Sequence, residues 1–169
     1  MYYFGYGSNL ASQRLLERLP NAIDYGVATL SGHRLCFRMN HNGESGKCDI
    51  EQTDNPDDIV YGVVYKITDE EKIILDGYEM LGFAYDDKMV EVTDLEGEIL
   101  KAVTYYALIT DGIQPPFHWY KNHVLRGAIE HHFPANYIKM IEAFPSMDDS
   151  NKSREQKEES IYIDPFTFD

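Results

Sequence analysis

The segment 59–67, IVYGVVYKI, constrains the fold of this chain more than any other. Its β-branched and aromatic residues favour a strand, and because nearly every position is apolar, both faces of that strand should be covered. Thr68 and Glu71 follow at the spacing of a capping box, which predicts that a helix begins there. We expect this helix to run to about Asp76 and to end at Gly77.

Strands are predicted on both sides of this segment, and helices near the end of the chain. The patterns predict strands at 2–6, 25–37 (with bulges at Gly26 and Gly32), 48–52, 88–94 and 99–108. A helix should then open at Pro115-Pro116 and run to about His132, and another should begin near Pro134. Because strands cluster first and helices last, we expect an α+β fold. Its sheet should be small, mixed and bent or closed like a barrel, with the helices flanking it.

Composition excludes several classes of function. The formal net charge of −14 repels phosphate backbones, so we expect no nucleic-acid partner. Two isolated cysteines, Cys36 and Cys48, and six histidines without metal-ligand spacing predict no metal and no cofactor. No apolar run approaches 18 residues, so no membrane segment is expected, and we predict a cytoplasmic protein.

The chain divides by composition near residue 146. Residues 1–145 are expected to form one domain, and residues 146–169 a polar, acidic tail. Because 146–160 is charged and poor in apolar residues, we expect it to be mobile. The apolar stretch 161–168 has three options that the sequence leaves open: docking on the body, docking on a second copy in a homodimer, or remaining loose.

The pentapeptide Tyr6-Gly7-Ser8-Asn9-Leu10 follows the first predicted strand and precedes a short helix. Consecutive main-chain N–H groups at such a turn can form a cradle for an anion. Gly7 allows close approach because it has no Cβ. An acidic protein can hold an acidic ligand in this way without lysine or arginine.

With this motif, the chain resembles the γ-glutamylcyclotransferase-like family over about residues 2 to 144. The resemblance implies that residues 6–10 bind substrate, that Glu79 is the catalytic acid/base, and that Tyr85 and Tyr120 line the pocket. Many members of the family have glycine directly after the catalytic glutamate, where this chain has Met80. The implied substrate is a small γ-glutamyl molecule.

The family reaction implied by the resemblance is intramolecular. The α-amine of a γ-glutamyl group attacks its own γ-carbonyl, which yields 5-oxoproline and releases an amine or amino acid. One carboxylate can take the proton of the attacking amine and return it to the leaving nitrogen. We expect burial among Tyr78, Phe83 and Tyr85 and the nearby helix C-terminus to raise the pKa of Glu79.

Other interpretations remain open at the level of sequence. The chain can instead be a non-catalytic binding module for a small acidic metabolite, although a carboxylate beside an anion cradle weakens such binding. Tyr85 and Tyr120 can be packing residues. Arg14, Arg38 and Arg126 can clamp a carboxylate, but ion-paired arginines at the surface are the simpler expectation. The leaving group and the oligomeric state are not determined.

Overall fold

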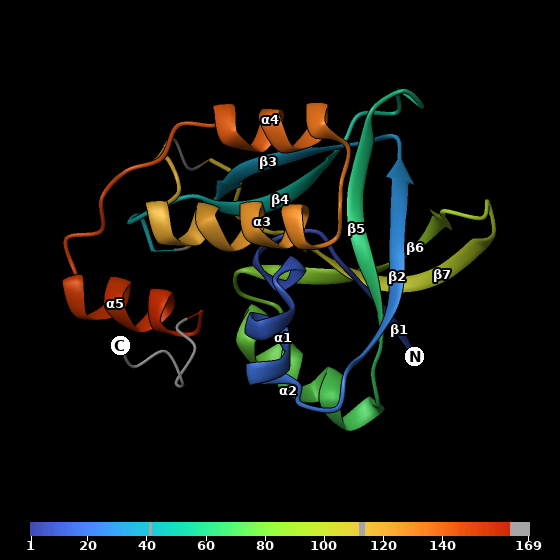
Figure 1. Ribbon diagram of the computed structural model, residues 1–169, viewed down its shortest axis with the longest axis horizontal. Helices are drawn as coiled ribbons and strands as arrows, with labels where there is room; N and C mark the ends of the chain where they lie inside the picture. Colours follow the sequence, from blue (N-terminus) through green and yellow to red (C-terminus); the bar gives the residue numbers. More distant parts are fainter. Residues whose placement is uncertain (41, 112–113, 163–169) are drawn as a thin grey trace, which may run out of the picture.

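The computed structural model describes residues 1–40, 42–111 and 114–162 (Figure 1). In chain order the elements are β1 (Tyr2–Gly5), the 3-10 helix η1 (Ser8–Leu10), α1 (Ser12–Arg18), β2 (Ile23–Ser31), β3 (His33–Met39), β4 (Lys47–Gln52), β5 (Ile59–Lys66), α2 (Asp69–Glu79), β6 (Tyr85–Asp94), β7 (Ile99–Ala107), α3 (His118–Glu130), α4 (Ala135–Ala143) and α5 (Lys152–Ser160). Within the described ranges, no helix combines the length and apolar character needed to cross a bilayer.

Five strands close into a barrel in the order β1-β5-β2-β6-β7. All neighbouring pairs are antiparallel except β7 and β1, which close the barrel in parallel through the pair Tyr3 and Val103. The expected α+β fold with a barrel-like mixed sheet is therefore confirmed. Strand β5 pairs with β1 on one side and β2 on the other, and most of its residues are buried, as its apolar sequence predicts.

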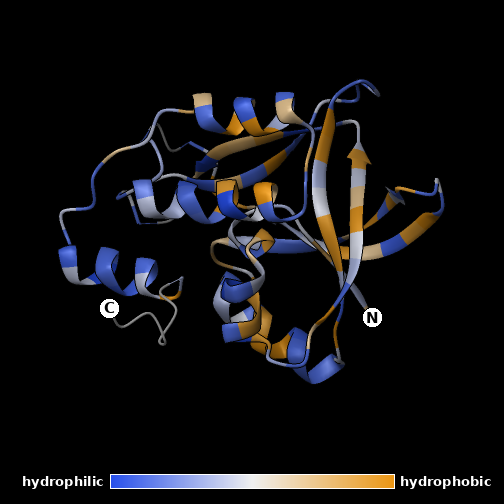
Figure 2. Ribbon diagram, in the orientation of Figure 1, coloured by the Kyte–Doolittle hydropathy of each residue, from blue (hydrophilic) through white to orange (hydrophobic). Residues whose placement is uncertain are grey.

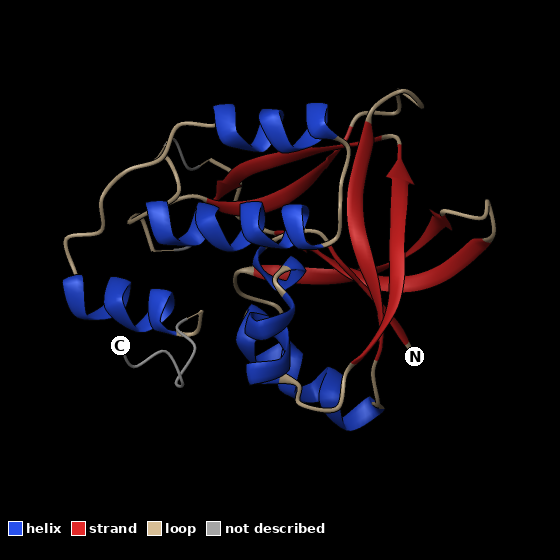
Figure 3. Ribbon diagram, in the orientation of Figure 1, coloured by secondary structure: helices blue, strands red, loops and turns tan. Residues whose placement is uncertain are grey.

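The helices gather on one side of the barrel, around the turn that follows β1 (Figure 3). Helix α3 packs directly on η1. At Gly127 of α3, a Cβ atom would lie only 2.3 Å from the main-chain carbon of Leu10, so a larger residue cannot be accommodated without moving the helix. Leu10 and Leu15 are fully buried beneath this contact. The packing holds the N-terminal turn in a fixed place.

The segment 25–37 differs from its predicted form. It is divided between two strands in different sheets: β2 belongs to the barrel, and β3 pairs with β4 in a separate two-stranded sheet. Gly32 lies between β2 and β3 with a φ of 70°, a left-handed conformation that glycine adopts without strain. Gly32 is therefore a turn residue and not a bulge, whereas the expected bulge at Gly26 is present.

Helix α2 begins as predicted and ends later than predicted. The capping box is formed: the Thr68 hydroxyl accepts from the Glu71 N–H, and the Glu71 carboxylate accepts from the Thr68 N–H. The helix then passes through Gly77 to Glu79, and Met80 is the left-handed residue that ends it, with φ 52° and ψ 52°. The predicted stop at Gly77 is wrong by three positions along the chain.

The C-terminal segment is more ordered than its composition predicts. Asn151 caps α5 by accepting from the Arg154 N–H, and Asp149 just before it is fully buried. Helix α5 is hydrophilic on all sides (Figure 2), which is why no apolar pattern announces it. The segment 146–160, expected to be a mobile tail, therefore contains a capped helix that its composition does not predict. Of the stretch 161–168, only Ile161 and Tyr162 lie within the described residues.

Candidate active site

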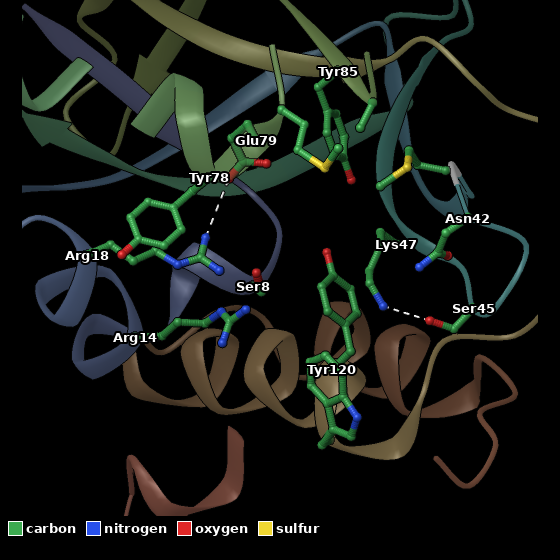
Figure 4. Close-up of a pocket in the computed structure, with 14 residues that line it drawn as sticks. Ser8, Arg14, Arg18, Asn42, Ser45, Lys47, Tyr78, Glu79, Tyr85 and Tyr120 are labelled. Atoms are coloured by element: carbon green, nitrogen blue, oxygen red, sulfur yellow. Dashed lines mark hydrogen bonds and ion pairs between the residues drawn. The ribbon is translucent and has the colours of Figure 1, made fainter. Parts of the chain in front are cut away.

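Two adjoining cavities open between the barrel, α1 and α3. The wider one has a volume of about 200 Å³ and is lined by residues of α1, the end of α2, the start of β4 and α3 (Figure 4). The deeper one, of about 30 Å³, is lined by the N-terminal turn and a group of tyrosines. Ser8, Glu79, Tyr85 and Tyr120 line both cavities, so the two form one continuous pocket.

Glu79 stands at the junction of the two cavities. It is the last residue of α2, and the sharp change of direction at Met80 leaves its side chain facing the pocket. The side chain is only 16% exposed. Burial raises the pKa of the Glu79 carboxyl, while Arg18, the amide of Asn9 and Arg14 oppose that rise.

The side chain of Asn9 fixes the position of the Glu79 carboxylate. Its amide Nδ2 donates to Glu79 Oε1 at 3.1 Å and to the Tyr3 hydroxyl at 3.0 Å. Its carbonyl Oδ1 accepts from the Arg18 guanidinium at 3.0 Å. Arg18 itself lies 3.7 Å from Glu79 Oε1. Asn9 is therefore a positioning residue for Glu79 as well as a member of the turn.

The main chain of the N-terminal turn faces the deeper cavity. Gly7, Ser8 and Asn9 all line it together with Glu79. Among the hydrogen bonds of the described residues, none uses the main-chain N–H of Gly7 or Ser8. A Cβ atom on Gly7 would lie 3.0 Å from Cys48 Cβ, so a side chain here would press on β4.

Three tyrosines from the predicted set surround the deeper cavity. Tyr6 donates from its hydroxyl to the Tyr105 carbonyl at 2.7 Å. Tyr85 donates to the Cys48 carbonyl at 2.6 Å, and the Tyr120 hydroxyl accepts from the Cys48 N–H at 3.1 Å. Burial raises the pKa of Tyr120, so its hydroxyl stays protonated.

Two details of the predicted site are wrong. Leu10 does not line the pocket: its side chain is fully buried in the core under α3, and its role is packing. Phe83, expected beside Glu79, is 75% exposed and lines neither cavity, whereas Tyr78 lines the wider one with Glu79. The burial comes from the tyrosines of the deeper cavity, whose positions along the sequence are too scattered to reveal a common site.

The pocket has a cationic side, of which the sequence interpretation named only Arg14. Arg14, Arg18 and Lys47 line the wider cavity. Arg14 is buried and paired with Glu158 of α5, so it is not the surface arginine that was expected. Arg18 and Lys47 lie in segments without a recognisable motif. Their role follows only from the fold.

The other two arginines considered from sequence lie elsewhere. Arg38 is bound by Asp49 at 2.7 Å and Glu51 at 2.8 Å, and it does not line the pocket. Arg126 lies over the ring of Tyr162, 4.4 Å from its centroid. Neither is placed to hold a ligand beside Glu79.

Comparison with known proteins assigns the chain to a family. Residues 59–141 match the model of the AIG2-like family. The protein called gamma-glutamylcyclotransferase in Bos taurus is 30% identical over 165 residues, which cover 94% of this chain and 86% of the relative. The human protein of the same name is also 30% identical over the same coverage.

Solved structures agree with this assignment. The crystal structure of an uncharacterized protein from Homo sapiens superposes with a TM-score of 0.83 at 30% identity, covering 96% of this chain and 98% of the other. A structure described as gamma-glutamyl cyclotransferase superposes with a TM-score of 0.81 at 27% identity, covering 93% and 98%. The chain therefore belongs to the γ-glutamylcyclotransferase-like family of enzymes.

Proposed function

We propose that this protein is a γ-glutamyl cyclotransferase that converts a γ-glutamyl amide into 5-oxoproline and a free amine or amino acid. One observation carries the proposal: the Glu79 carboxylate and the main chain of Gly7, Ser8 and Asn9 line the same small cavity. This arrangement supplies an acid/base group and neutral donors on either side of one reacting carbonyl.

Glu79 acts as the proton carrier. The α-amine of the substrate is an ammonium at neutral pH, with an ordinary pKa of about 8. Ionised Glu79 takes a proton from it, and the nitrogen then attacks the γ-carbonyl carbon to close the five-membered ring. The same carboxyl gives that proton to the departing nitrogen as the C–N bond breaks, and the ring nitrogen loses its second proton to the released amine, which leaves as an ammonium. The raised pKa of Glu79 makes this return easier.

The N-terminal turn binds negative charge. The main-chain N–H groups of Gly7 and Ser8, which have no acceptor among the described residues, are available to the α-carboxylate or to the oxyanion that develops on the γ-carbonyl. Neutral donors suit this place because they bind negative charge without adding a further cation beside Glu79, which already lies 3.7 Å from Arg18. The glycine at position 7 keeps the donors within reach of the ligand.

The small cavity favours a folded substrate. The deeper cavity beside Glu79 is narrow, so we expect a γ-glutamyl chain bound there to bend and bring its amine toward its own carbonyl. Well-oriented intramolecular attack can lower a barrier by roughly 7–11 kcal/mol. The buried tyrosines around the cavity exclude water, which would otherwise compete as a nucleophile.

The first prediction tests Glu79 directly. The protein is incubated with a panel of γ-glutamyl dipeptides, and 5-oxoproline is measured by mass spectrometry. We expect product from at least one member of the panel. Glu79→Gln should lower the rate by about 100- to 10,000-fold, the usual range for losing a general acid/base.

A matched control lies in the same helix. Glu70→Gln makes the same chemical change at an exposed position in the first turn of α2 and should leave the rate close to that of the wild type. Thermal unfolding of both variants verifies that they are folded. Full turnover by Glu79→Gln would remove this residue from the mechanism, and no product from any dipeptide would favour the binding module instead.

A further inference from the structure

Lys47 is a pocket residue to which the proposed reaction gives no task. It is the first residue of β4 and lines the wider cavity. Figure 4 shows its side chain across the pocket from Glu79, beyond the hydroxyl of Tyr120. Its position is therefore on the side where the departing half of a substrate would lie if the γ-glutamyl half occupies the deeper cavity.

The ammonium group of Lys47 is held in an aromatic cage. Its Nζ lies 4.6 Å from the ring centroid of Tyr120, 5.0 Å from that of Trp119 and 5.3 Å from that of Phe117. It donates to the Ser45 hydroxyl at 2.7 Å, and Ser45 is itself buried, with 3% exposure. The rings and the hydroxyl hold the ammonium group in place, and they leave its positive charge unneutralised.

The neighbouring cations are paired, and Lys47 is not. Arg14 binds Glu158, and Arg154 binds Asp149 and Glu44. No ion pair among the described residues includes Lys47. Burial, with help from Arg154 and Arg14, lowers the pKa of Lys47 to about 8. Among the described residues, the positive charge of Lys47 thus has no anionic partner, although the formal net charge of the protein is −14.

We propose that Lys47, together with the Ser45 hydroxyl, is a specificity-determining residue that binds a carboxylate on the departing half of the substrate. This inference rests on the proposed cyclotransferase activity. It assigns to the enzyme γ-glutamyl derivatives whose leaving group is an amino acid or peptide with a free carboxylate, in preference to γ-glutamyl alkylamines. Lys47 does not touch the reacting atoms, so its effect is on selection and not on the chemical step.

The test uses two substrates that differ by one carboxylate, γ-glutamyl-L-alanine and γ-glutamyl-ethylamine. We expect the wild type to prefer the first by about 10- to 100-fold in kcat/KM, the range for a hydrogen bond to a charged group. Lys47→Met removes the charge but keeps an unbranched apolar side chain that packs well against aromatic rings. It should abolish the preference by raising KM for γ-glutamyl-L-alanine alone.

Two further variants sharpen the test. Lys47→Arg retains the charge and should retain part of the preference. Lys101→Met makes the same change in net charge on the exposed part of β7, away from the pocket, and should behave as the wild type. Unaltered turnover of γ-glutamyl-ethylamine by Lys47→Met shows, in the same assay, that the active site of that variant is intact.

Three results would overturn the proposal. Equal losses on both substrates in Lys47→Met would show that the residue is only a structural brace between β4 and α3. Equal use of both substrates by the wild type would show that the pocket has no carboxylate subsite, while the proposed cyclotransferase activity would still be supported. Absence of 5-oxoproline from either substrate with the wild type would reject the proposed function itself, and this inference with it.

Discussion

The ionisation of Glu79 is set by neighbours that act in opposite directions. Withdrawal from water favours the neutral acid, whereas the Arg18 guanidinium 3.7 Å away and the Asn9 amide favour the carboxylate. Burial dominates, so the pKa of Glu79 lies above its ordinary value of 4.5. Because the reaction begins with Glu79 ionised and the substrate amine protonated, the acidic limb of the pH–rate profile should report the pKa of Glu79.

Arg18→Met should move this acidic limb to higher pH. Arg18 lowers the pKa of Glu79, so removing its charge raises that pKa, and a higher pH is then needed to ionise the carboxyl. The measurement is kcat/KM for one substrate across the pH range. Arg34→Met, in the exposed part of β3, is the control for loss of a positive charge and should not move the limb. An unchanged limb in Arg18→Met would show that another group controls it.

At this scale, the sequence predicts residues that belong to a motif and misses residues that do not. Glu79 and the Gly7–Asn9 turn lie about 70 positions apart, and only the family resemblance connects them before the fold is known. Lys47 lies beside a loop of ordinary composition, and its cage is assembled from α3 and the segment before it. Leu10 belongs to the motif and yet serves the core, because its side chain points under α3.

Among the elements, α2 decides where Glu79 lies. Its start was predictable because a capping box is a local pattern of side chain and main chain. Its end was not, because Gly77 is a common stop residue and a methionine in the left-handed conformation is rare. Because the helix continues through residues 77–79, its last residue, Glu79, lies at the pocket. Glycine at position 80 would adopt this left-handed conformation with less strain than Met80 does.

Gly77→Ala should stabilise the protein by about 0.5–1 kcal/mol. Gly77 lies inside α2, and a Cβ atom there would meet no atom within 4 Å, so alanine gains helix propensity without a clash. The free energy of unfolding is measured by urea denaturation, with Gly32→Ala as the contrasting variant. Gly32 has a φ of 70°, so that substitution should destabilise the protein. Destabilisation by Gly77→Ala would mean that the helix ends at position 77 after all.

Two other elements show what local pattern does not reveal. The segment 25–37 has continuous strand character, and the division into β2 and β3 depends on which partner strand each half meets: β5 and β6 for β2, and β4 for β3. Helix α5 has no apolar face, so periodicity cannot detect it. Its anchors are polar and come from residues distant in sequence, such as Arg14.

Across the whole molecule, charged groups join the C-terminal segment to the catalytic body. Glu158 of α5 binds Arg14 of α1 and lies 3.0 Å from His123 of α3. Asp149, which precedes α5, accepts from the Trp119 indole at 2.8 Å. Both contacts support residues that line the pocket, since Arg14 and Trp119 form part of its wall. Polar contacts of the C-terminal segment therefore support the wall of the active site.

Asp149→Asn should lower the free energy of unfolding at neutral pH by about 1–3 kcal/mol, because it removes the charge that Arg154, the Trp119 indole and the Asn151 N–H satisfy in a fully buried place. These partners hold the pKa of Asp149 well below its ordinary value of 3.8. A depressed pKa contributes stability above the unfolded-state pKa, and that contribution is lost as the pH falls. The difference in the free energy of unfolding between wild type and variant should therefore become smaller from about pH 5 downward. Urea denaturation at a series of pH values measures it, with Asp148→Asn, whose side chain is 84% exposed, as the control. A difference that stays constant in acid would mean that the Asp149 charge does not anchor the C-terminal segment.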